Sequence, residues 1–301
     1  MKFFMLTVLL LVIAIDATLA CECGREGSSS RIYKGKEVKS HKYPWMIYSI
    51  SYDDRKNKTS DYDECGGVLI DETHYITIAT CLTNKETAKT RKPEDTYIII
   101  GRINAYKETT KPIAVSKIWI DPRYNTSDLT YDLAVVTLAT PVKYSQIMGP
   151  ICLPDFESGL SKLTVAGWGY NSSEDNADRS ENLFEVEVDY MNKEECNKAQ
   201  TDYVMTELGI PESKRNRLRV TDVKEDVLCA INKKTRGTFC DGDNGGPLMH
   251  HGSDGRWYLM GIAQGAWASC GEANDRTSLY TRIFPNKDII KSLAPNSCWR
   301  K

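Results

Sequence analysis

The sequence predicts an all-β protein built from closed barrels, with one helix near the C-terminal end. Short runs rich in β-branched and aromatic residues recur between polar turns, which is the pattern of strands. Clear examples are residues 97–100, 133–138, 163–168, 184–188 and 257–262. No heptads or internal repeats occur, and helical periodicity is weak until residues 286–293. Many short strands favour barrels, because closure leaves no strand edge unpaired.

Residues 1–20 have the features of a secretory signal peptide. A basic start precedes an apolar run at residues 3–15, and the small residue Ala20 precedes the expected cleavage site ahead of Cys21. The run is shorter than the roughly 20 residues of a membrane-spanning helix, and no later run is long and apolar enough to span a bilayer. We therefore expect a secreted, extracellular protein without a membrane partner.

The composition narrows the classes of partner and cofactor. The chain has 39 Lys and Arg residues against 41 Asp and Glu, a formal net charge of −2, which provides no broad basic face for a nucleic acid. Neither a calcium loop nor zinc-ligand spacing is present. The adjacent His250 and His251 would point to opposite faces of a strand, so they do not converge on one ion. We expect no nucleic-acid partner, no metal and no other cofactor.

Two further features fit an extracellular protein. All ten cysteines follow residue 20, and an even number in an oxidising compartment indicates full pairing, although spacing alone does not show which cysteines pair. Three Asn-X-Ser/Thr motifs begin at Asn57, Asn125 and Asn171, each in a polar turn, and we expect glycans at these positions.

Three motifs carry a family resemblance. Residues 240–248 read Cys-Asp-Gly-Asp-Asn-Gly-Gly-Pro-Leu and resemble the Gly-Asp-Ser-Gly-Gly-Pro signature of the chymotrypsin-like (S1 family) serine proteases, with Asn244 at the position of the nucleophilic serine. Residues 75–81 are similar to the segment that carries the general-base histidine, with Thr80 in its place. The segment Tyr-Asp-Leu-Ala-Val-Val is similar to the one that carries the third triad member, here Asp132. The resemblance covers almost the whole mature chain.

The resemblance implies two six-stranded antiparallel β-barrels of the trypsin-like kind, with the site between them, and a C-terminal helix. It divides the chain into a signal peptide at 1–20, a pro-segment at 21–31 and a peptidase-like domain at 32–301. The N-terminal barrel is expected at about 32–150 and the C-terminal barrel at about 151–301.

The resemblance also implies four disulfides, and elimination pairs the two remaining cysteines. The implied pairs are Cys23–Cys152, Cys65–Cys81, Cys196–Cys229 and Cys240–Cys270, and the remaining pair is Cys21–Cys298.

The residues at the triad positions predict that catalysis is lost. Acyl transfer needs an activated hydroxyl, a base with a pKa near neutral and a carboxylate that orients the base. Asn244 offers a carboxamide, whose nitrogen lone pair is delocalised and whose oxygen carries no transferable proton. The Thr80 hydroxyl has a very high pKa and does not accept a proton usefully. Only Asp132 is left, so we predict a catalytically inactive serine-protease homologue that acts by binding an extracellular protein.

Two alternatives stay open. One is an active hydrolase with a non-standard site, in which Thr80 is the nucleophile and Asp132 its base, although a carboxylate with a pKa of about 3.9 is a weak base for an alcohol. The other is a structural or storage protein. For the binding role, family precedent includes modulators of proteolytic or immune cascades and venom or salivary components. The partner would then be a protease, an inhibitor or an immune component, bound by a monomer.

The residues expected around the specificity pocket also differ from the family pattern. Thr238 occupies the position of an aspartate in trypsins, and the bulky Phe239 follows it. Ala266 and Ser278 stand where glycines commonly line the pocket, and Gln264 stands where a serine usually begins the substrate-binding strand. Together with the altered triad, these residues indicate relaxed constraint on the whole cleft.

The activation device, by contrast, resembles that of the family. The pair Arg31-Ile32 matches the cleavage junction, and in the family the freed ammonium group pairs with an aspartate, here Asp243. A buried ion pair that forms only after cleavage orders a flexible region. The alternative is that Arg31 is simply an exposed basic residue and Asp243 a remnant. Gly242 is also in place for a backbone oxyanion pocket.

One segment departs from the family. Between Cys196 and Cys229 the chain is longer than usual, and it contains the basic run at residues 214–219. We interpret this segment as a solvated surface loop. A surface for an acidic partner and a processing site are the alternatives.

Overall fold

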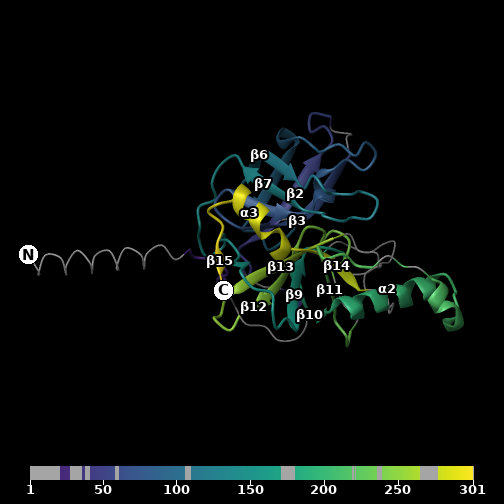
Figure 1. The fold of residues 1–301 in the computed structure, drawn as a ribbon. Helices are drawn as coiled ribbons and strands as arrows, with labels where there is room; N and C mark the ends of the chain where they lie inside the picture. Colours follow the sequence, from purple (N-terminus) through teal and green to yellow (C-terminus); the bar gives the residue numbers. More distant parts are fainter. Residues whose placement is uncertain are drawn as a thin grey trace, which may run out of the picture.

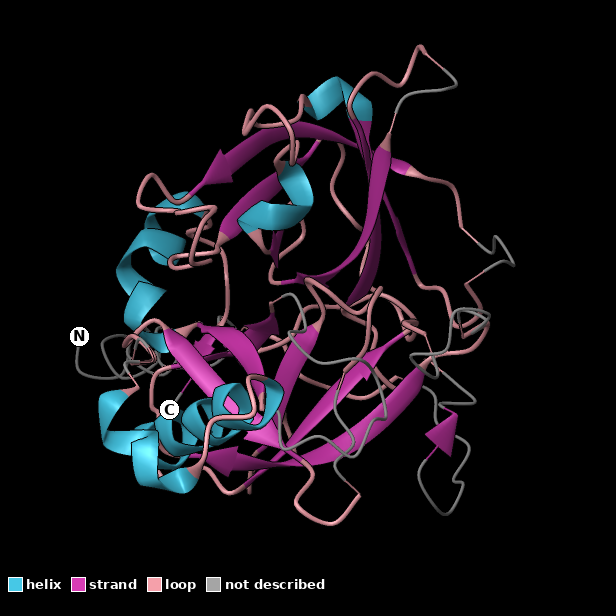
Figure 2. Ribbon diagram, turned by 90° about the vertical axis from the view of Figure 1, so that its right-hand side faces the viewer, coloured by secondary structure: helices cyan, strands magenta, loops and turns pink. Residues whose placement is uncertain are grey.

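The chain consists of two closed six-stranded antiparallel β-barrels, which lie one above the other in Figures 1 and 2. This arrangement comes from a computed structural model and confirms the expected fold class. The residues that the structure describes are 21–27, 36–37, 41–57, 61–105, 110–170, 180–218, 220, 222–235, 239–264 and 277–300.

The first barrel closes in the order β2-β3-β4-β7-β6-β5. Its strands are β2 (Met46–Tyr52), β3 (Tyr62–Leu69), β4 (His74–Thr77), β5 (Thr96–Ile100), β6 (Ile113–Ile120) and β7 (Ala134–Leu138). Aliphatic side chains from these strands fill its interior, and Ile47, Val68, Ile76 and Val136 are completely buried. Burial of each such side chain stabilises the fold by about 1.5–3 kcal/mol.

The second barrel contains β9-β12-β13-β14-β11-β10 and closes through the pairing of β10 with β9. Its strands are β9 (Lys162–Gly167), β10 (Phe184–Met191), β11 (Val227–Ile231), β12 (Pro247–His251), β13 (Trp257–Ala263) and β14 (Ser278–Arg282). The short strand β1 (Lys36–Glu37) adds to its edge at β10. Phe239 and Tyr280 pack in its core with ring centroids 5.2 Å apart.

The two barrels touch through backbone where the candidate site lies. The Gly66 N–H of β3 donates to the Asn244 carbonyl at 2.6 Å. A Cβ atom at Gly66 would lie 2.7 Å from the Gly246 nitrogen, so only glycine permits this approach. The Thr77 hydroxyl of β4 donates to the Gly66 carbonyl at 2.9 Å. Because the loop before β12 packs on β3, residues far apart in the sequence converge at this seam.

Disulfides tie both ends of the chain to the barrels. Four join the described residues: Cys21–Cys298, Cys23–Cys152, Cys65–Cys81 and Cys196–Cys229. Each of the four is an expected pair. Cys240 is also disulfide-bonded, whereas Cys270, its expected partner, lies outside the described residues.

The remaining short elements border the barrels. β8 (Leu153–Pro154) pairs with β15 (Trp299–Arg300). The single turns are η1 (Ala79–Leu82), η2 (Pro93–Asp95), η3 (Glu212–Arg217) and η4 (Phe284–Asn286). Helix α3 (Lys287–Leu293) lies where the sequence predicts a C-terminal helix.

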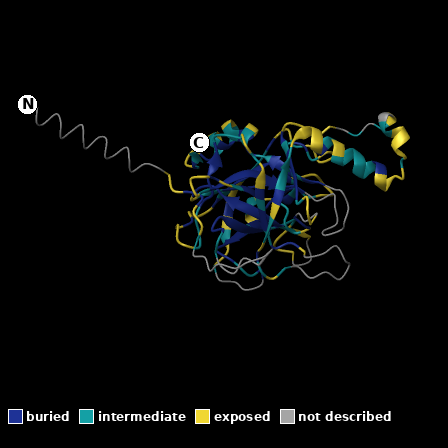
Figure 3. Cartoon of the chain, turned by 90° about the horizontal axis from the view of Figure 1, so that it is seen from below, coloured by how far each residue is buried: buried dark blue, intermediate teal, exposed yellow. Residues whose placement is uncertain are grey.

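The segment expected to be a surface loop contains a 15-residue helix, α2 (Lys193–Glu207), which the weak periodicity did not predict. An Asn192–Glu195 capping box starts it, and Cys196 anchors it to β11. Its far end projects from the barrels in Figure 3 with exposed residues. Only Cys196 and Met205 are buried on the helix, so it has no apolar stripe for a sequence pattern to reveal. Among the described residues, no helix is long and apolar enough to cross a membrane.

The basic run lies partly on η3, beyond the end of α2. Arg215 forms ion pairs with Asp202 and Glu212, so this cation holds η3 against α2. Lys214 and Arg217 are exposed, and position 219 lies outside the described residues.

Candidate functional site

Three connections place the triad-position residues at the seam between the barrels. Thr80 lies in η1, directly after β4. Asp132 lies two positions before the first residue of β7, and β7 pairs with β4. Asn244 lies in the loop before β12, which contacts β3 through Gly66. The Cys65–Cys81 disulfide joins β3 to η1 and so fixes one wall of the site.

Thr80 and Asp132 are in direct contact through two hydrogen bonds. The Thr80 N–H donates to Asp132 Oδ1 at 2.8 Å, and the Thr80 hydroxyl donates to Asp132 Oδ2 at 2.8 Å. Asp132 is completely buried. Burial raises the pKa of Asp132 to about 6, because desolvation of the carboxylate outweighs the opposing hydrogen bonds from Thr80 and Ala79.

Tyr124 is a site residue that the sequence analysis missed. Its hydroxyl lies 2.8 Å from the Thr80 hydroxyl. The single Thr80 hydroxyl proton is directed to Asp132, so Tyr124 is the donor in this contact. Burial, and secondly the Asp132 charge, raise the pKa of Tyr124, which keeps the phenol neutral. Tyr124 stands in a polar turn eight positions before Asp132, and nothing in that turn marks it as functional.

No histidine takes the place of the missing base. All four histidines lie in the described residues, and none has a hydrogen bond with Thr80, Tyr124 or Asp132. His74 is paired instead with the buried Asp71, with 2.9 Å between Nδ1 and Oδ2. The site is therefore a chain of two hydroxyls and a carboxylate.

Asn244 contributes backbone rather than side-chain interactions. Its carbonyl accepts from Gly66, whereas its buried side-chain oxygen has no hydrogen-bond partner among the described residues. Neither the Gly242 N–H nor the Asn244 N–H donates to an acceptor in the described part of the chain. Gly242 has φ of +89°, a conformation that favours glycine. Two backbone donors are thus available at the position expected for an oxyanion pocket.

Asp243 lines a cavity of about 280 Å³. Asp243 Oδ1 accepts from the Gly169 N–H at 2.6 Å, and Oδ2 accepts from the Cys240 N–H at 2.9 Å. A Cβ atom at Gly167 would lie 1.8 Å from Asp243 Oδ1, so glycine makes room for the carboxylate. Phe184, Val186 and Phe239 provide apolar walls.

The expected activation junction, Arg31 and Ile32, lies outside the described residues. The neighbouring β1 nevertheless pairs with β10, with Lys36 opposite Glu185. Glu185 is itself a lining residue of the Asp243 cavity. Ile32 lies four positions before Lys36, a reach of roughly 13 Å in an extended chain.

The other expected pocket residues are buried or lie outside the described residues. Phe239 is 1% exposed and belongs to the core of the second barrel. Ser278 is buried at the start of β14. Gln264 is also buried, and its Nε2 donates to the Leu129 carbonyl and to the Thr281 hydroxyl. Thr238 and Ala266 lie outside the described residues.

Gln264 links the two barrels behind the site. The Thr281 hydroxyl, which accepts from Gln264 at 3.0 Å, donates to the Asp132 carbonyl at 2.7 Å. Gln264 therefore supports the turn that carries Asp132.

A mostly apolar cavity of about 370 Å³ adjoins the site. Leu129 and Gln264 form its inner wall, and α2 contributes Tyr203 and Val204. Val223, which follows the insertion, closes another side. Helix α2 thus builds a wall next to the Asp132 turn.

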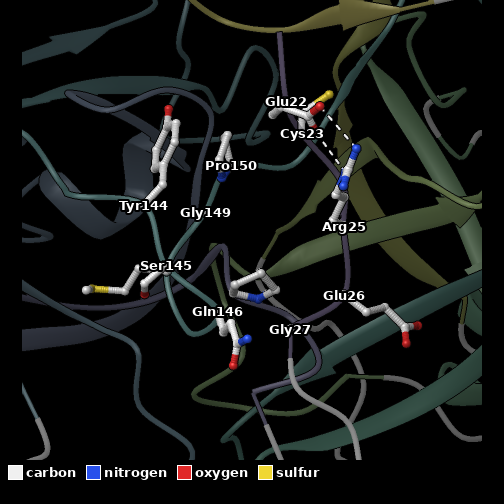
Figure 4. A pocket seen from close by; sticks show the side chains of 12 residues that line it. Glu22, Cys23, Arg25, Glu26, Gly27, Tyr144, Ser145, Gln146, Gly149 and Pro150 are labelled. Atoms are coloured by element: carbon white, nitrogen blue, oxygen red, sulfur yellow. Dashed lines mark hydrogen bonds and ion pairs between the residues drawn. The ribbon is translucent and has the colours of Figure 1, made fainter.

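A further cavity, of about 390 Å³, lies beside the N-terminal segment and is lined by Cys23 but by none of the triad-position residues (Figure 4). Its walls come from residues 22–27 and 144–150. The Glu22–Arg25 ion pair borders it, and Tyr144 lies on the opposite side in Figure 4.

Two of the three expected glycan positions are described, and both suit modification. Asn57 and Asn125 are exposed in turns. Asn171 lies outside the described residues.

Comparison with known proteins agrees with this architecture. The family model described as Trypsin matches residues 32–290. Mannan-binding lectin serine protease 1 of Rattus norvegicus is 28% identical over 275 residues, 87% of this chain and 35% of that protein. Testisin of Homo sapiens is 28% identical over 292 residues, 93% of this chain and 83% of that protein.

Vitamin K-dependent protein C of Oryctolagus cuniculus is 26% identical over 277 residues, 87% of this chain and 52% of that protein. The chain therefore spans less than two thirds of the length of this relative and of the lectin-associated protease.

Proposed function

The chain belongs to the trypsin family of serine proteases, and we propose that it is a secreted member that binds another protein without hydrolysing peptides. The domain organisation in this proposal is a signal peptide at 1–20, a pro-segment at 21–31 and a binding domain at 32–301. The family match that begins at residue 32 and the disulfides at Cys21 and Cys23 support this division.

The observation that carries the proposal is the contact between Thr80 and Asp132. In a working triad the carboxylate orients an imidazole, which removes the proton from the nucleophile. Here both oxygens of Asp132 are occupied by Thr80, and the next group along is the Tyr124 hydroxyl. Neither hydroxyl accepts a proton near neutral pH, so among the described residues no imidazole or equivalent base stands between Asp132 and the position of the nucleophile.

Asn244, in the loop before β12, also supports the proposal that the protein does not hydrolyse peptides. A carboxamide does not form an acyl intermediate of the serine type, and its side-chain oxygen is buried without a partner. Removal of the serine or the histidine lowers turnover by about six orders of magnitude in an unrelated protease that uses the same triad. Replacement of both residues is expected to leave negligible peptidase activity.

The binding part of the proposal rests on what the cleft still offers. The Gly242 and Asn244 N–H groups lack acceptors among the described residues, so a carbonyl oxygen of a bound segment can satisfy them. The adjoining apolar cavity beside Leu129 and Tyr203 provides room for a side chain. An extracellular protease, inhibitor or immune component that presents an extended segment is the proposed partner.

The test combines activity with binding. Purified chain, with and without cleavage after Arg31, is incubated with a fluorophosphonate probe and a broad peptide library. We expect no labelling and no turnover, with the Asn244→Ser variant carrying Thr80→His as the positive comparison. Saturable capture of one extracellular protein, weakened by substitutions at Tyr203, supports the binding role, whereas labelling or turnover by the unmodified chain contradicts it.

One observation favours the hydrolase alternative and deserves its own control. The Thr80 hydroxyl donates to a carboxylate whose pKa is raised to about 6, which is the geometry of a nucleophile with its base. The pKa of an alcohol remains far above 6, so proton transfer is strongly uphill. If Thr80 is the nucleophile, any activity will vanish in Thr80→Val and survive in Asn244→Ala. A protein that neither reacts nor captures a partner would favour the storage alternative.

A further inference from the structure

Three side chains form a linear series of hydrogen bonds that runs from the buried Asp132 to the half-buried Tyr124. Tyr124 donates to the Thr80 hydroxyl, and the Thr80 hydroxyl donates to Asp132 Oδ2, each over 2.8 Å. Each hydroxyl carries one proton, so the direction of every bond follows from the state of the carboxylate. With Asp132 ionised, all protons point inward.

The inner end of the series is fixed in orientation. Asp132 is completely buried, and its Oδ1 accepts from the Thr80 N–H. That contact needs an acceptor at Oδ1 whether or not Asp132 is ionised. A proton taken up by Asp132 must therefore sit on Oδ2, where it faces the Thr80 hydroxyl oxygen.

The outer end of the series is open. Tyr124 is half-buried, and its hydroxyl contacts no described residue other than Thr80. When the Tyr124 proton points inward, the hydroxyl presents only oxygen lone pairs to a ligand. When the proton points outward, the same hydroxyl is a hydrogen-bond donor.

We propose that Asp132, Thr80 and Tyr124 act as a proton-controlled relay that switches the Tyr124 hydroxyl between an acceptor and a donor for a bound peptide carbonyl. Uptake of one proton from solvent on Asp132 Oδ2 makes Asp132 the donor to Thr80. The Thr80 hydroxyl then rotates to donate to Tyr124, and the Tyr124 proton rotates outward. No heavy-atom bond forms or breaks.

The described surroundings of Asp132 indicate that its protonation sets the direction of the hydrogen bonds in the series. Desolvation raises the pKa of Asp132 to about 6, within the range of mildly acidic fluids. Backbone and hydroxyl donors from Ala79 and Thr80 face the carboxylate, and among the described residues the other titratable group of the series is Tyr124 itself. From the described C-terminal barrel, the neutral Thr281 hydroxyl contacts the Asp132 carbonyl.

Charged groups in the neighbourhood gather around Tyr131 instead. The Tyr131 N–H donates to Asp226, and the Arg123 guanidinium lies 4.1 Å from the Tyr131 ring centre. Arg123 is paired with Asp121. None of these groups has a hydrogen bond with the side chains of Asp132, Thr80 or Tyr124 among the described residues.

The relay has a consequence for ligands. A carbonyl oxygen placed at Tyr124 is repelled by the lone pairs of the ionised state and accepts a hydrogen bond in the protonated state. Carbonyl binding at this position therefore strengthens in acid. The effect on a bound carbonyl rests on the proposed binding function, whereas the relay itself is a property of the free protein.

The test follows the NMR signals of Asp132 and Tyr124, the two ends of the relay, in the free, full-length mature protein. Aspartate labelled with ¹³C at Cγ and tyrosine labelled with ¹³C at Cζ are followed by NMR from pH 4.5 to 8. Spectra of Asp132→Asn and Tyr124→Phe identify the two signals by difference. We expect both signals to titrate with one shared midpoint of about 6.

Matched substitutions separate the relay from a direct effect of charge. Thr80→Ser keeps the hydroxyl and should keep the coupled Tyr124 titration. Thr80→Val removes the hydroxyl but leaves the Asp132 charge, so the Asp132 signal should titrate while the Tyr124 signal stays flat. In Asp132→Asn the amide nitrogen replaces Oδ2 as a donor, and the Tyr124 signal should hold its acid-state value at every pH.

Three results would overturn the proposal. They are an Asp132 signal that does not titrate in this range, a Tyr124 signal that is flat in the unmodified protein, and a Tyr124 titration that persists in Thr80→Val. If Thr80→Val does not fold, Thr80→Ala serves the same comparison, with Thr80→Ser as its folded control.

Discussion

Thr80 occupies both oxygens of Asp132: its N–H donates to Oδ1 and its hydroxyl to Oδ2, each over 2.8 Å. A triad carboxylate normally orients a base, but here it orients a residue that has no basic group. The turn between β4 and η1 is therefore held in place by the carboxylate. The side chain that the carboxylate orients is, however, an alcohol, which does not act as a base.

Restoring the serine alone should not restore proteolysis. In Asn244→Ser the new hydroxyl has no imidazole beside it, because Asp132 is bonded to the Thr80 hydroxyl and the Thr80 hydroxyl to that of Tyr124. Steady-state cleavage of a peptide library should stay at background for this variant. Adding Thr80→His should yield weak activity at best. Robust turnover by the single variant would mean that the base has been assigned wrongly.

The N-terminal segment should stay attached after cleavage at Arg31. Cys21 and Cys23 are bonded to Cys298 and Cys152. Mass spectrometry without reductant should show the segment retained, and reduction should release it. Replacing Cys21 and Cys298 together by serine should not release it, because the Cys23 bond remains. A free thiol at Cys298 would contradict the pairing.

Backbone hydrogen bonds support the same prediction. The Gly24 N–H donates to the Pro150 carbonyl at 2.8 Å, and the Trp257 N–H donates to the Gly24 carbonyl at 2.9 Å. A Cβ atom at Gly24 would lie 2.4 Å from the Trp257 carbonyl oxygen. The segment is thus packed into the body by its backbone as well as by its disulfides.

Asp132 should make the fold less stable as pH rises from about 4 to about 6. Its pKa is raised in the folded state from 3.8 to about 6, so between these values the folded protein binds more protons than the unfolded chain. The contribution is fully present below pH 3.8 and is lost as pH passes the folded pKa.

Urea unfolding of the unmodified protein and of Asp132→Asn at several pH values measures this term. The difference in unfolding free energy between the two proteins should shift by about 1–3 kcal/mol across the window, in favour of the unmodified protein at low pH. Other carboxylates titrate equally in both proteins and cancel. A difference that is independent of pH would show that Asp132 is not perturbed by burial.

Cleavage at Arg31 should order the loop around Gly242 through Asp243. The Asp243 cavity has apolar walls and a carboxylate that suit an Ile32 ammonium group with its side chain. Hydrogen exchange of residues 239–246 should slow after cleavage, and Asp243→Asn should abolish the change. Partner affinity should then rise by about 1–3 kcal/mol in the cleaved form. Identical exchange and affinity in both forms would mark the junction as a relic.

Gly66→Ala should destabilise the seam between the barrels. Its Cβ would lie 2.7 Å from the Gly246 nitrogen, and backbone at this position has little room to shift. We expect a loss of about 1–3 kcal/mol in unfolding free energy. Gly149→Ala is the control, because its Cβ would meet nothing within 4 Å. Equal stability of the two variants would show that the seam tolerates separation.

Local patterns in the sequence were enough for much of the fold. The β-rich runs at residues 97–100, 133–138, 163–168, 184–188 and 257–262 correspond to β5, β7, β9, β10 and β13, because strand formation depends largely on neighbouring residues. The motifs around Thr80, Asp132 and Asn244 located three sides of the site in the same way. Helix α2 was not predicted, because its capping box lies in a segment with no apolar periodicity and its anchor is a disulfide to β11.

By itself, the sequence determined which chemical groups the site contains: a carboxylate, an alcohol and a carboxamide, with no imidazole. Only the tertiary structure decided how they are connected. Tyr124 reaches Thr80 because the turn after β6 packs over η1, and Gln264 supports Asp132 through Thr281 across the barrel seam. Such contacts join residues distant in sequence, and the direction of each hydrogen bond depends on partners and burial. Neither these contacts nor the directions of their hydrogen bonds follow from a local run of residues.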